Sequence, residues 1–294
     1  MVAETVTVMP LVVIVGPTAS GKTSLSIELA KRFNGEIICA DSRTIYKDMN
    51  IGTAKPTVEE RENIPHWGLD LVEPGSYFTV ADFKKYADQK IKEIRSRNRV
   101  PFLVGGSGLY VDAVLFDYTF GSSADQHLRA RLNNLSLEQL HAYCYKNNIA
   151  LPENKKNKRY VIRTIEQAGL KTKRSDKLMN NAIVAGITAD KNILKVRIRQ
   201  RAEQMFKNGV VEETILLSTK YGWNNEAMSG IVYRIVQEHL LGKLSFNDAV
   251  DKFATSDWKL AKKQITWFKR NIYIKWLSLK EAKLYISQCL AIEH

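Results

Sequence analysis

The segment Gly16–Thr23, with the sequence GPTASGKT, constrains the fold of this chain more than any other feature. It fits the pattern G-x-x-x-x-G-K-[ST], which cradles phosphate groups where it joins a strand to a helix. A short β-branched apolar run, Leu11–Val15, precedes the loop, and a helical pattern follows it. The sequence therefore predicts a strand, a phosphate-binding loop and a helix, in that order, within an α/β domain.

The residue types in this loop also predict its chemistry. Glycines let the backbone curl so that successive N–H groups face phosphate oxygens, and the helix N-terminus adds partial positive charge. Lys22 is predicted to neutralise the outer phosphate, and the Thr23 hydroxyl to ligate Mg²⁺. The loop does not distinguish ATP or GTP from a diphosphate on another substrate, and a glycine turn that binds nothing is the remaining alternative.

Further apolar runs alternate with helical patterns along the chain. The expected strands are Glu36–Ala40, Val100–Val104 and Ala182–Thr188, and the expected helices are Val80–Arg97 and Asn192–Lys207, with more helix through Lys275. This alternation predicts an α/β fold like that of P-loop NTPases, with a parallel sheet flanked by helices. In such sheets, ligands bind at the carboxyl ends of the strands.

The pattern changes between Gly121 and Asn181, where short polar helices alternate with Asn- and Lys-rich turns and no strand is evident. We therefore predict an inserted all-helical domain over residues 121–181. The two halves of the phosphate-loop core are then residues 1–120 and 182–294.

Charge indicates the kind of partner. The chain has 44 Lys and Arg against 31 Asp and Glu, a net charge of +13, which attracts polyanions. Basic residues gather at 146–177 and 259–275, with aromatic residues beside them that could stack on bases. Nucleic acid is therefore a candidate partner, and a solvated basic surface is the alternative.

Two kinds of feature are absent from the sequence, and each absence excludes a class of protein. No stretch approaches the ~20 consecutive apolar residues of a membrane span, and the N-terminus has no basic leader, so we expect a cytoplasmic protein with no membrane partner. The three cysteines, Cys39, Cys144 and Cys289, lie far apart in the sequence. They form no close C-x-x-C pair for zinc or redox chemistry, so reduced thiols are expected.

Two segments that follow predicted strands carry candidate site residues. Asp41 could hold Mg²⁺ through water, accept a proton from a substrate nucleophile, or cap a helix that begins near Ser42. The turn Gly105–Gly108 offers backbone N–H groups and the Ser107 hydroxyl to a ligand, or simply allows close helix–sheet packing. Lys55 is either an anion contact or a plain loop lysine.

An arginine interrupts an apolar helix face. In the helix that contains LKVRIRQRAEQMFKNG, Arg201 falls on the same face as Leu194, Ile198 and Met205. A guanidinium in that position needs an anionic partner. Either a carboxylate of the fold or a substrate phosphate meets this need.

Several blocks of sequence, in one order from Gly16 to about Trp276, carry a resemblance to a known family. They are GPTASGKTSLSIELAKRFNGEIICADSR, YKDMNIGTAKP, IPHWGLDLVEP, ADF, PFLVGGSGLYVDAVL, RIRQRAEQM, NGVVEE and AKKQITWFKR. With these blocks the chain resembles the tRNA dimethylallyltransferases, also called tRNA isopentenyltransferases. The resemblance implies transfer of a dimethylallyl group from dimethylallyl diphosphate to N6 of the adenosine 3′-adjacent to the anticodon in tRNA, with release of diphosphate.

The resemblance also implies roles for individual residues. Asp41 would be the general base for the adenine amine, Thr18 and Ser107 would lie at the substrates, and Arg201 would neutralise the departing diphosphate, with Mg²⁺ at Thr23. The implied diphosphate-binding residues are Gly16, Thr18, Ala19, Ser20, Gly21, Lys22 and Thr23.

The implied partners are dimethylallyl diphosphate and the tRNA anticodon stem-loop, bound by a monomer. The implied tRNA-binding residues are Asp41, Ser42, Arg43, Thr44, Arg129, Arg159, Arg163, Tyr233, Arg234, Lys262, Lys263, Gln264 and Trp267. The chain departs from the family pattern at Tyr160, Val232 and Trp258, where Arg, Gly and Arg are common.

Three other functions are compatible with a phosphate loop. They are prenyl transfer to free adenine nucleotides by an adenylate isopentenyltransferase, phosphoryl transfer by a small-molecule kinase, and RNA binding by a non-catalytic ATPase-like protein. A free nucleotide needs no basic inserted domain, which favours tRNA as the prenyl acceptor.

Overall fold

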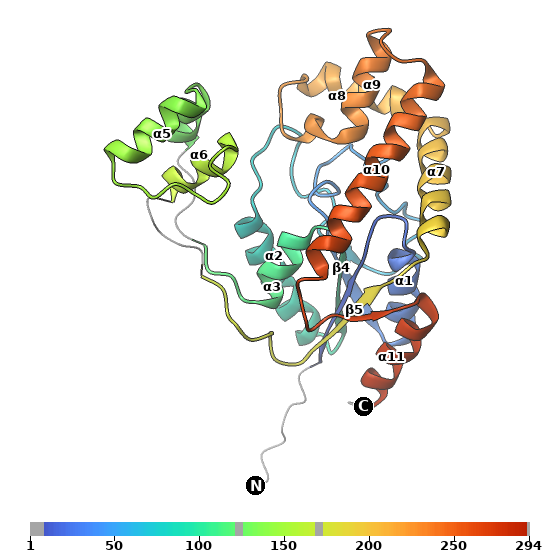
Figure 1. Cartoon of the computed structure of the whole chain (residues 1–294). Coiled ribbons are helices and arrows are strands. Elements are labelled where there is room, and N and C mark those ends of the chain that lie inside the picture. The colour runs from blue at the N-terminus through green and yellow to red at the C-terminus, as the bar shows by residue number, and fades with distance from the viewer. Residues whose placement is uncertain (1–8, 121–125, 168–172, 293–294) are drawn as a thin grey trace. The chain divides into compact units, whose positions relative to one another are not determined.

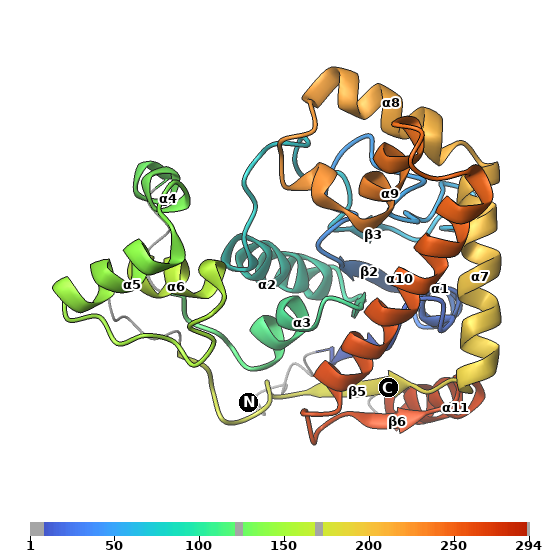
Figure 2. The same ribbon diagram turned by 45° about the horizontal axis from the view of Figure 1, so that its top comes forward.

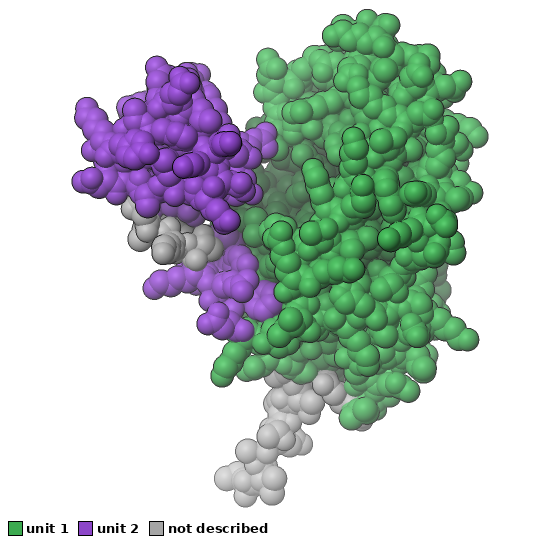
Figure 3. Space-filling view, in the orientation of Figure 1, with its two compact units in different colours: residues 1–115, 177–294 green, residues 116–176 purple. Residues whose placement is uncertain are grey.

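The computed structural model describes residues 9–120, 126–167 and 173–292, which form two compact units. Unit 1 comprises Met1–Leu115 and Lys177–His294, and unit 2 comprises Phe116–Asp176 (Figure 3). The N-terminal residues 1–8, expected to lack a leader, and the expected domain boundary at Gly121 lie outside the described residues. Among the described helices, none has the length and apolar character needed to cross a membrane.

The core of unit 1 is a six-stranded parallel sheet, which confirms the predicted fold class. The strands are β1 Leu11–Val15, β2 Gly35–Ala40, β3 His66–Trp67, β4 Val100–Gly105, β5 Ala182–Ile187 and β6 Lys275–Leu277, in the order β3-β2-β4-β1-β5-β6. The central strand β1 pairs through Val13 with Leu103 of β4 and Val184 of β5. The expectation of helix through Lys275 was wrong, because Lys275 begins the edge strand β6.

Helices cover both faces of this sheet (Figure 1). The helices α1 Lys22–Arg32 and α11 Leu279–Ile292 pack on one face, where Ile14 meets Leu29 and Ile286 in one buried cluster. The helices α2 Val80–Ser96 and α3 Gly108–Leu115 lie on the other side. The α2 helix begins at a capping box in which Thr79 and Asp82 satisfy each other's backbone N–H groups.

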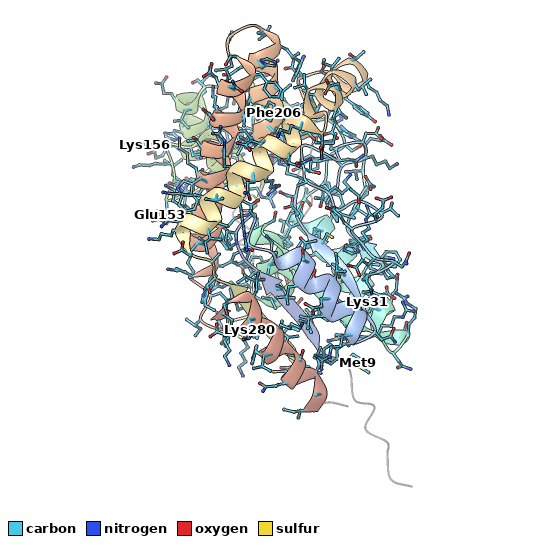
Figure 4. All side chains as sticks on the ribbon, turned by 90° about the vertical axis from the view of Figure 1, so that its right-hand side faces the viewer. Met9, Lys31, Glu153, Lys156, Phe206 and Lys280 are labelled. Atoms are coloured by element: carbon cyan, nitrogen blue, oxygen red, sulfur yellow. The ribbon has the colours of Figure 1, made fainter. Side chains whose placement is uncertain are left out.

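The remaining helices of unit 1 form a layer at the carboxyl edge of the sheet. They are α7 Lys191–Lys207, α8 Val210–Tyr221, α9 Ile231–Leu240 and α10 Phe246–Phe268, with a short 3₁₀ turn at Ala227–Ser229. The long helices α7 and α10 run side by side (Figure 2). Their shared core includes Phe206, labelled near the end of α7 in Figure 4, together with Phe253 and Tyr233.

Unit 2 is helical around its own small core. It contains α4 Gln126–Asn133, α5 Leu137–Lys146 and α6 Lys158–Glu166, and buries Leu132, Leu140, Cys144, Val161, Ile162 and Ile165. The two connecting segments pair with each other through Thr119 and Lys173. Unit 2 therefore begins earlier than expected, at Phe116, and it ends at Asp176 rather than at 181, because the Met179 N–H bonds the Leu115 carbonyl oxygen within unit 1.

Candidate functional site

A cavity of about 1380 Å³ opens at the carboxyl ends of β1, β2 and β4 in unit 1. Its walls come from the phosphate loop, the segment 41–44, the glycine turn after β4, and the helices α7, α9, α10 and α11. Lys280, labelled near the start of α11 in Figure 4, lines it as well. The cavity therefore joins residues from both ends of the chain.

The phosphate loop curls tightly before α1. Gly21 has a φ of +87°, a conformation that favours glycine, and a Cβ atom at this position would lie 2.9 Å from Leu279 Cδ1. Ala19 also has a positive φ, of 58°. The Lys22 Nζ donates a hydrogen bond to the Pro17 carbonyl oxygen at 2.9 Å, which closes the loop on itself.

The electrostatics of Lys22 depend on its neighbours in the cavity. Burial lowers the pKa of Lys22 to about 8, and the charge of Arg201 acts in the same direction. The carboxylates of Asp41 and Asp257 oppose this shift and raise the pKa. Asp41 therefore lies close enough to the phosphate loop to act on its lysine.

Asp41 follows β2 and lines the cavity. Its Oδ1 accepts a hydrogen bond from the Arg43 backbone N–H at 2.8 Å. The residues after it form a turn rather than a helix, so Asp41 does not cap a helix. One carboxylate oxygen holds this turn, and the carboxylate as a whole faces the same cavity as Lys22.

The glycine turn after β4 serves both packing and the site. A Cβ atom at Gly105 would overlap the Ala40 carbonyl oxygen, and one at Gly106 would overlap the Gln264 amide. Close packing therefore requires these glycines. Ser107, which follows these two glycines, accepts a hydrogen bond from the Ser42 backbone N–H at 3.0 Å, so the turn after β4 is tied to the segment that carries Asp41.

Arg201 reaches the phosphate loop from α7. Its guanidinium donates to the Thr18 hydroxyl, and its Nη1 lies 3.7 Å from Asp257 Oδ2. The structure therefore supplies a carboxylate partner for Arg201 and also places the guanidinium at the cavity. Sequence reasoning missed Asp257, although an acid on the face of α10 shared with Phe253 and Leu260 is the same kind of signal that singled out Arg201.

Gln264 joins the two loops of the site. Its Oε1 accepts a hydrogen bond from the Thr18 N–H at 2.8 Å, and its Nε2 donates to the Gly106 carbonyl oxygen at 3.2 Å. Trp267, one turn later on α10, donates from Nε1 to Asp112 at 2.7 Å. Both side chains were expected to bind tRNA, and both hold parts of unit 1 together at the wall of the cavity.

The other residues expected to bind tRNA divide between the two units. In unit 1, Ser42, Arg43, Thr44, Tyr233 and Lys263 line the cavity, Arg234 is exposed on α9, and Lys262 lines a basic groove with Lys259, Thr266, Trp267 and Arg270. In unit 2, the Arg129 guanidinium donates two hydrogen bonds to the buried Glu166, and Arg163 lies 3.6 Å from the same carboxylate, whereas Arg159 is exposed.

Lys55 has a structural role. Its buried ammonium donates to the Tyr46 carbonyl oxygen, to Asn50 Oδ1 and to Asp70 Oδ1 at 2.5–2.9 Å. These contacts satisfy all three of its donors within the fold. Of the two alternatives for Lys55, the structure supports the loop lysine.

Comparison with known proteins gives a consistent result. The family model described as IPP transferase matches residues 44–271, and the model described as isopentenyl transferase matches residues 9–72. A Bacillus velezensis protein named tRNA dimethylallyltransferase is 38% identical, over 96% of this chain and 96% of its own. A Bacillus subtilis protein of the same name is 36% identical, over 93% and 92% of the two chains.

Solved structures share the whole fold. A tRNA isopentenylpyrophosphate transferase from Bacillus halodurans superposes with a TM-score of 0.74 at 35% identity and covers 97% of both chains. A eukaryotic dimethylallyltransferase acting on tRNA superposes with a TM-score of 0.79 at 24% identity, over 92% of this chain and 74% of that one.

Proposed function

This chain belongs to the tRNA dimethylallyltransferase family, and from this premise we propose that it transfers the dimethylallyl group of dimethylallyl diphosphate to N6 of the adenosine 3′-adjacent to the anticodon in tRNA. The observation that carries the proposal is that one cavity contains both the phosphate loop and Asp41. A phosphate-binding loop beside a carboxylate suits a reaction in which a diphosphate departs while an amine loses a proton. Among the described residues, those that line the cavity come from unit 1, and we propose that the protein acts as a monomer.

In this proposal the phosphate loop stabilises the leaving group. Displacement at an allylic carbon breaks the carbon–oxygen bond to the diphosphate, and negative charge grows on the diphosphate oxygens. The groups that can donate to these oxygens line the cavity at the phosphate loop. They are the loop N–H groups, the Lys22 ammonium, the Thr18 hydroxyl and Arg201. Fixed donors that face growing charge lower the barrier, because they need no reorganisation during the reaction.

Asp41 acts as the general base. The N6 amine attacks the allylic carbon, a new carbon–nitrogen bond forms, and the surplus proton of the amine passes to the Asp41 carboxylate. Its hydrogen bond to the Arg43 N–H fixes its position at the end of β2. To reach Asp41, the target adenine must leave its stack in the tRNA. This costs a few kcal/mol and is cheapest in a loop.

We propose Mg²⁺ as the cofactor, held by the Thr23 hydroxyl and the diphosphate oxygens. Within the described residues, no three His, Cys, Asp or Glu side chains cluster to hold a metal ion. Mg²⁺ fits this site, because it is often bound by few protein ligands together with substrate phosphates. When bound, it would neutralise charge on the diphosphate.

The acceptor can be tested directly. Purified protein is incubated with labelled dimethylallyl diphosphate and Mg²⁺, with unmodified tRNA in one reaction and AMP in another. Label on tRNA at the adenosine 3′ of the anticodon supports the proposal, whereas label on AMP would select an adenylate isopentenyltransferase. Turnover of ATP with a metabolite panel, without use of the allylic donor, would select a kinase.

The pKa of Lys22 gives the affinity for diphosphate a pH dependence. Burial lowers this pKa to about 8, so the ammonium carries its charge below that pH and loses it above. We expect the affinity for inorganic pyrophosphate to fall by up to about tenfold per pH unit as the pH rises above 8. Calorimetric titration at several pH values checks this. Pyrophosphate itself also titrates in this pH range, and it does so equally with wild type and with Lys22→Met. The additional loss of affinity that Lys22 causes should therefore appear only with wild type.

The basic groove of α10 should bind the tRNA backbone. We expect the Lys262→Ala, Arg270→Ala double variant to bind tRNA more weakly and to lower the slope of log affinity against log salt by about two, since two phosphate contacts are lost. Filter binding over a range of salt concentrations measures both quantities. Lys92→Ala, which removes an exposed charge from α2, is the control. An unchanged slope in the double variant would exclude this groove from the RNA contact.

A further inference from the structure

A negative charge is buried within the positively charged part of the cavity. The Asp257 side chain on α10 lines the cavity, and the residue is only 4% exposed. Its Oδ2 lies 3.7 Å from Arg201 Nη1 and accepts a hydrogen bond from the Thr18 hydroxyl at 3.5 Å. Asp257 thus touches two groups that the proposed function places at the departing diphosphate.

The Asp257 carboxylate repels the diphosphate anion that the phosphate loop is proposed to bind. Its presence in the cavity therefore needs an explanation. A buried charge is costly unless it is paired, and Arg201 supplies the pairing. The Arg201 Nε is buried and has no hydrogen-bond partner among the described residues. The guanidinium is therefore held by Asp257 at one nitrogen and retains a donor that the fold does not satisfy.

Charges from several elements face Asp257. Burial raises the pKa of Asp257 above its usual value, and the charge of Asp41 acts in the same direction, whereas Arg201 of α7, Lys22 of α1 and the hydrogen bond from Thr18 lower it. An arriving diphosphate adds further negative charge and favours the protonated carboxyl. Before diphosphate binds, by contrast, the carboxylate offsets one of the two positive charges.

We propose that Asp257 is a positioning residue that holds Arg201 and Thr18 in place before substrate binds and, through its charge, weakens the hold of this site on the diphosphate product so that it can leave. The inference rests on the proposed function. It assigns Asp257 no contact with the reacting atoms. The carboxylate orders two donors before substrate binds and limits product affinity afterwards.

The test compares Asp257→Asn and Asp257→Ser, which both remove the charge, with Asp251→Asn as the matched control. Asp251 lies on the same helix and pairs with Arg199 at an exposed site outside the cavity. Calorimetry measures the affinity of each folded protein for inorganic pyrophosphate with Mg²⁺. We expect both Asp257 variants to bind pyrophosphate about tenfold more tightly than wild type, and Asp251→Asn to be unchanged.

Kinetics and pH distinguish this role from a merely structural one. The Asp257 variants should show stronger product inhibition by pyrophosphate and a lower kcat, without a higher KM for dimethylallyl diphosphate. Wild type should gain more pyrophosphate affinity than the variants as the pH falls below neutrality, because only wild type can protonate this carboxyl, whose pKa is raised by burial.

The outcomes separate the inference from the proposed function. Unchanged or weaker pyrophosphate binding in the Asn and Ser variants would overturn the role of Asp257, even if wild type transfers the prenyl group normally. Wild-type protein that binds pyrophosphate but transfers no label to tRNA would instead contradict the proposed function. If one variant fails to fold, the other still decides the result.

Discussion

Replacing Asp41 by Asn should lower kcat for dimethylallyl transfer by about 10²–10⁴-fold, while tRNA still binds. The adenine amine is a poor nucleophile, and the amide cannot take its proton. The amide oxygen can still accept the hydrogen bond from the Arg43 N–H, so the turn after β2 should persist. Single-turnover transfer of labelled prenyl group to tRNA measures the rate, and filter binding measures the tRNA affinity.

The comparison of Asn with Ala at this position separates chemistry from structure. Asp41→Ala loses both the base and the acceptor for the Arg43 N–H, so its defect should be at least as large. Ser107 also holds the segment through the Ser42 N–H, which should keep the backbone near its place in both variants. An equal loss of tRNA binding and of transfer in Asp41→Asn would refute the role of base.

The parts of this site that could be predicted from the sequence are those that depend on residues close together in the sequence. The strand Leu11–Val15, the loop after it and Lys22 follow one another directly, so a local pattern determines them. Asp41 and Ser107 could be placed because parallel strands end at one edge of a sheet. Their contact through the Ser42 N–H agrees with that placement.

The parts that could not be predicted depend on contacts across the whole chain. Asp257 and Gln264 meet Thr18 from more than two hundred residues away, because α10 crosses the carboxyl edge of the sheet. Periodicity indicates that α10 is a helix, but it does not say which element its polar side chains meet. The strands His66–Trp67 and Lys275–Leu277 are too short to give an alternating pattern.

This dependence on long-range contacts changes the interpretation of α10. Its basic residues suggest RNA binding, and Lys259, Lys262 and Arg270 do line the basic groove. Gln264 on the same helix is bonded to both loops of the cavity. We therefore expect one helix to connect the RNA contact with the leaving-group site.

Replacing Lys22 by Met should lower kcat by about 10²–10³-fold, the usual effect of removing one donor that faces growing charge. The side chain keeps its length but loses its ammonium, which donates a hydrogen bond to the Pro17 carbonyl oxygen. Pyrophosphate affinity should fall as well, because the cavity then loses one of the two positive charges that act on Asp257. Rapid-quench transfer assays and calorimetry with pyrophosphate measure the two effects.

Lys31→Met is the matched control for this prediction. Lys31 lies on the same helix and pairs with Glu62 at the surface, so its loss should leave both measurements unchanged. A Lys22→Met protein that keeps wild-type kcat would place the departing diphosphate elsewhere than the phosphate loop. If its kcat falls while pyrophosphate binding is unchanged, Lys22 acts on the transition state alone, because an interaction made equally with product would appear in both quantities.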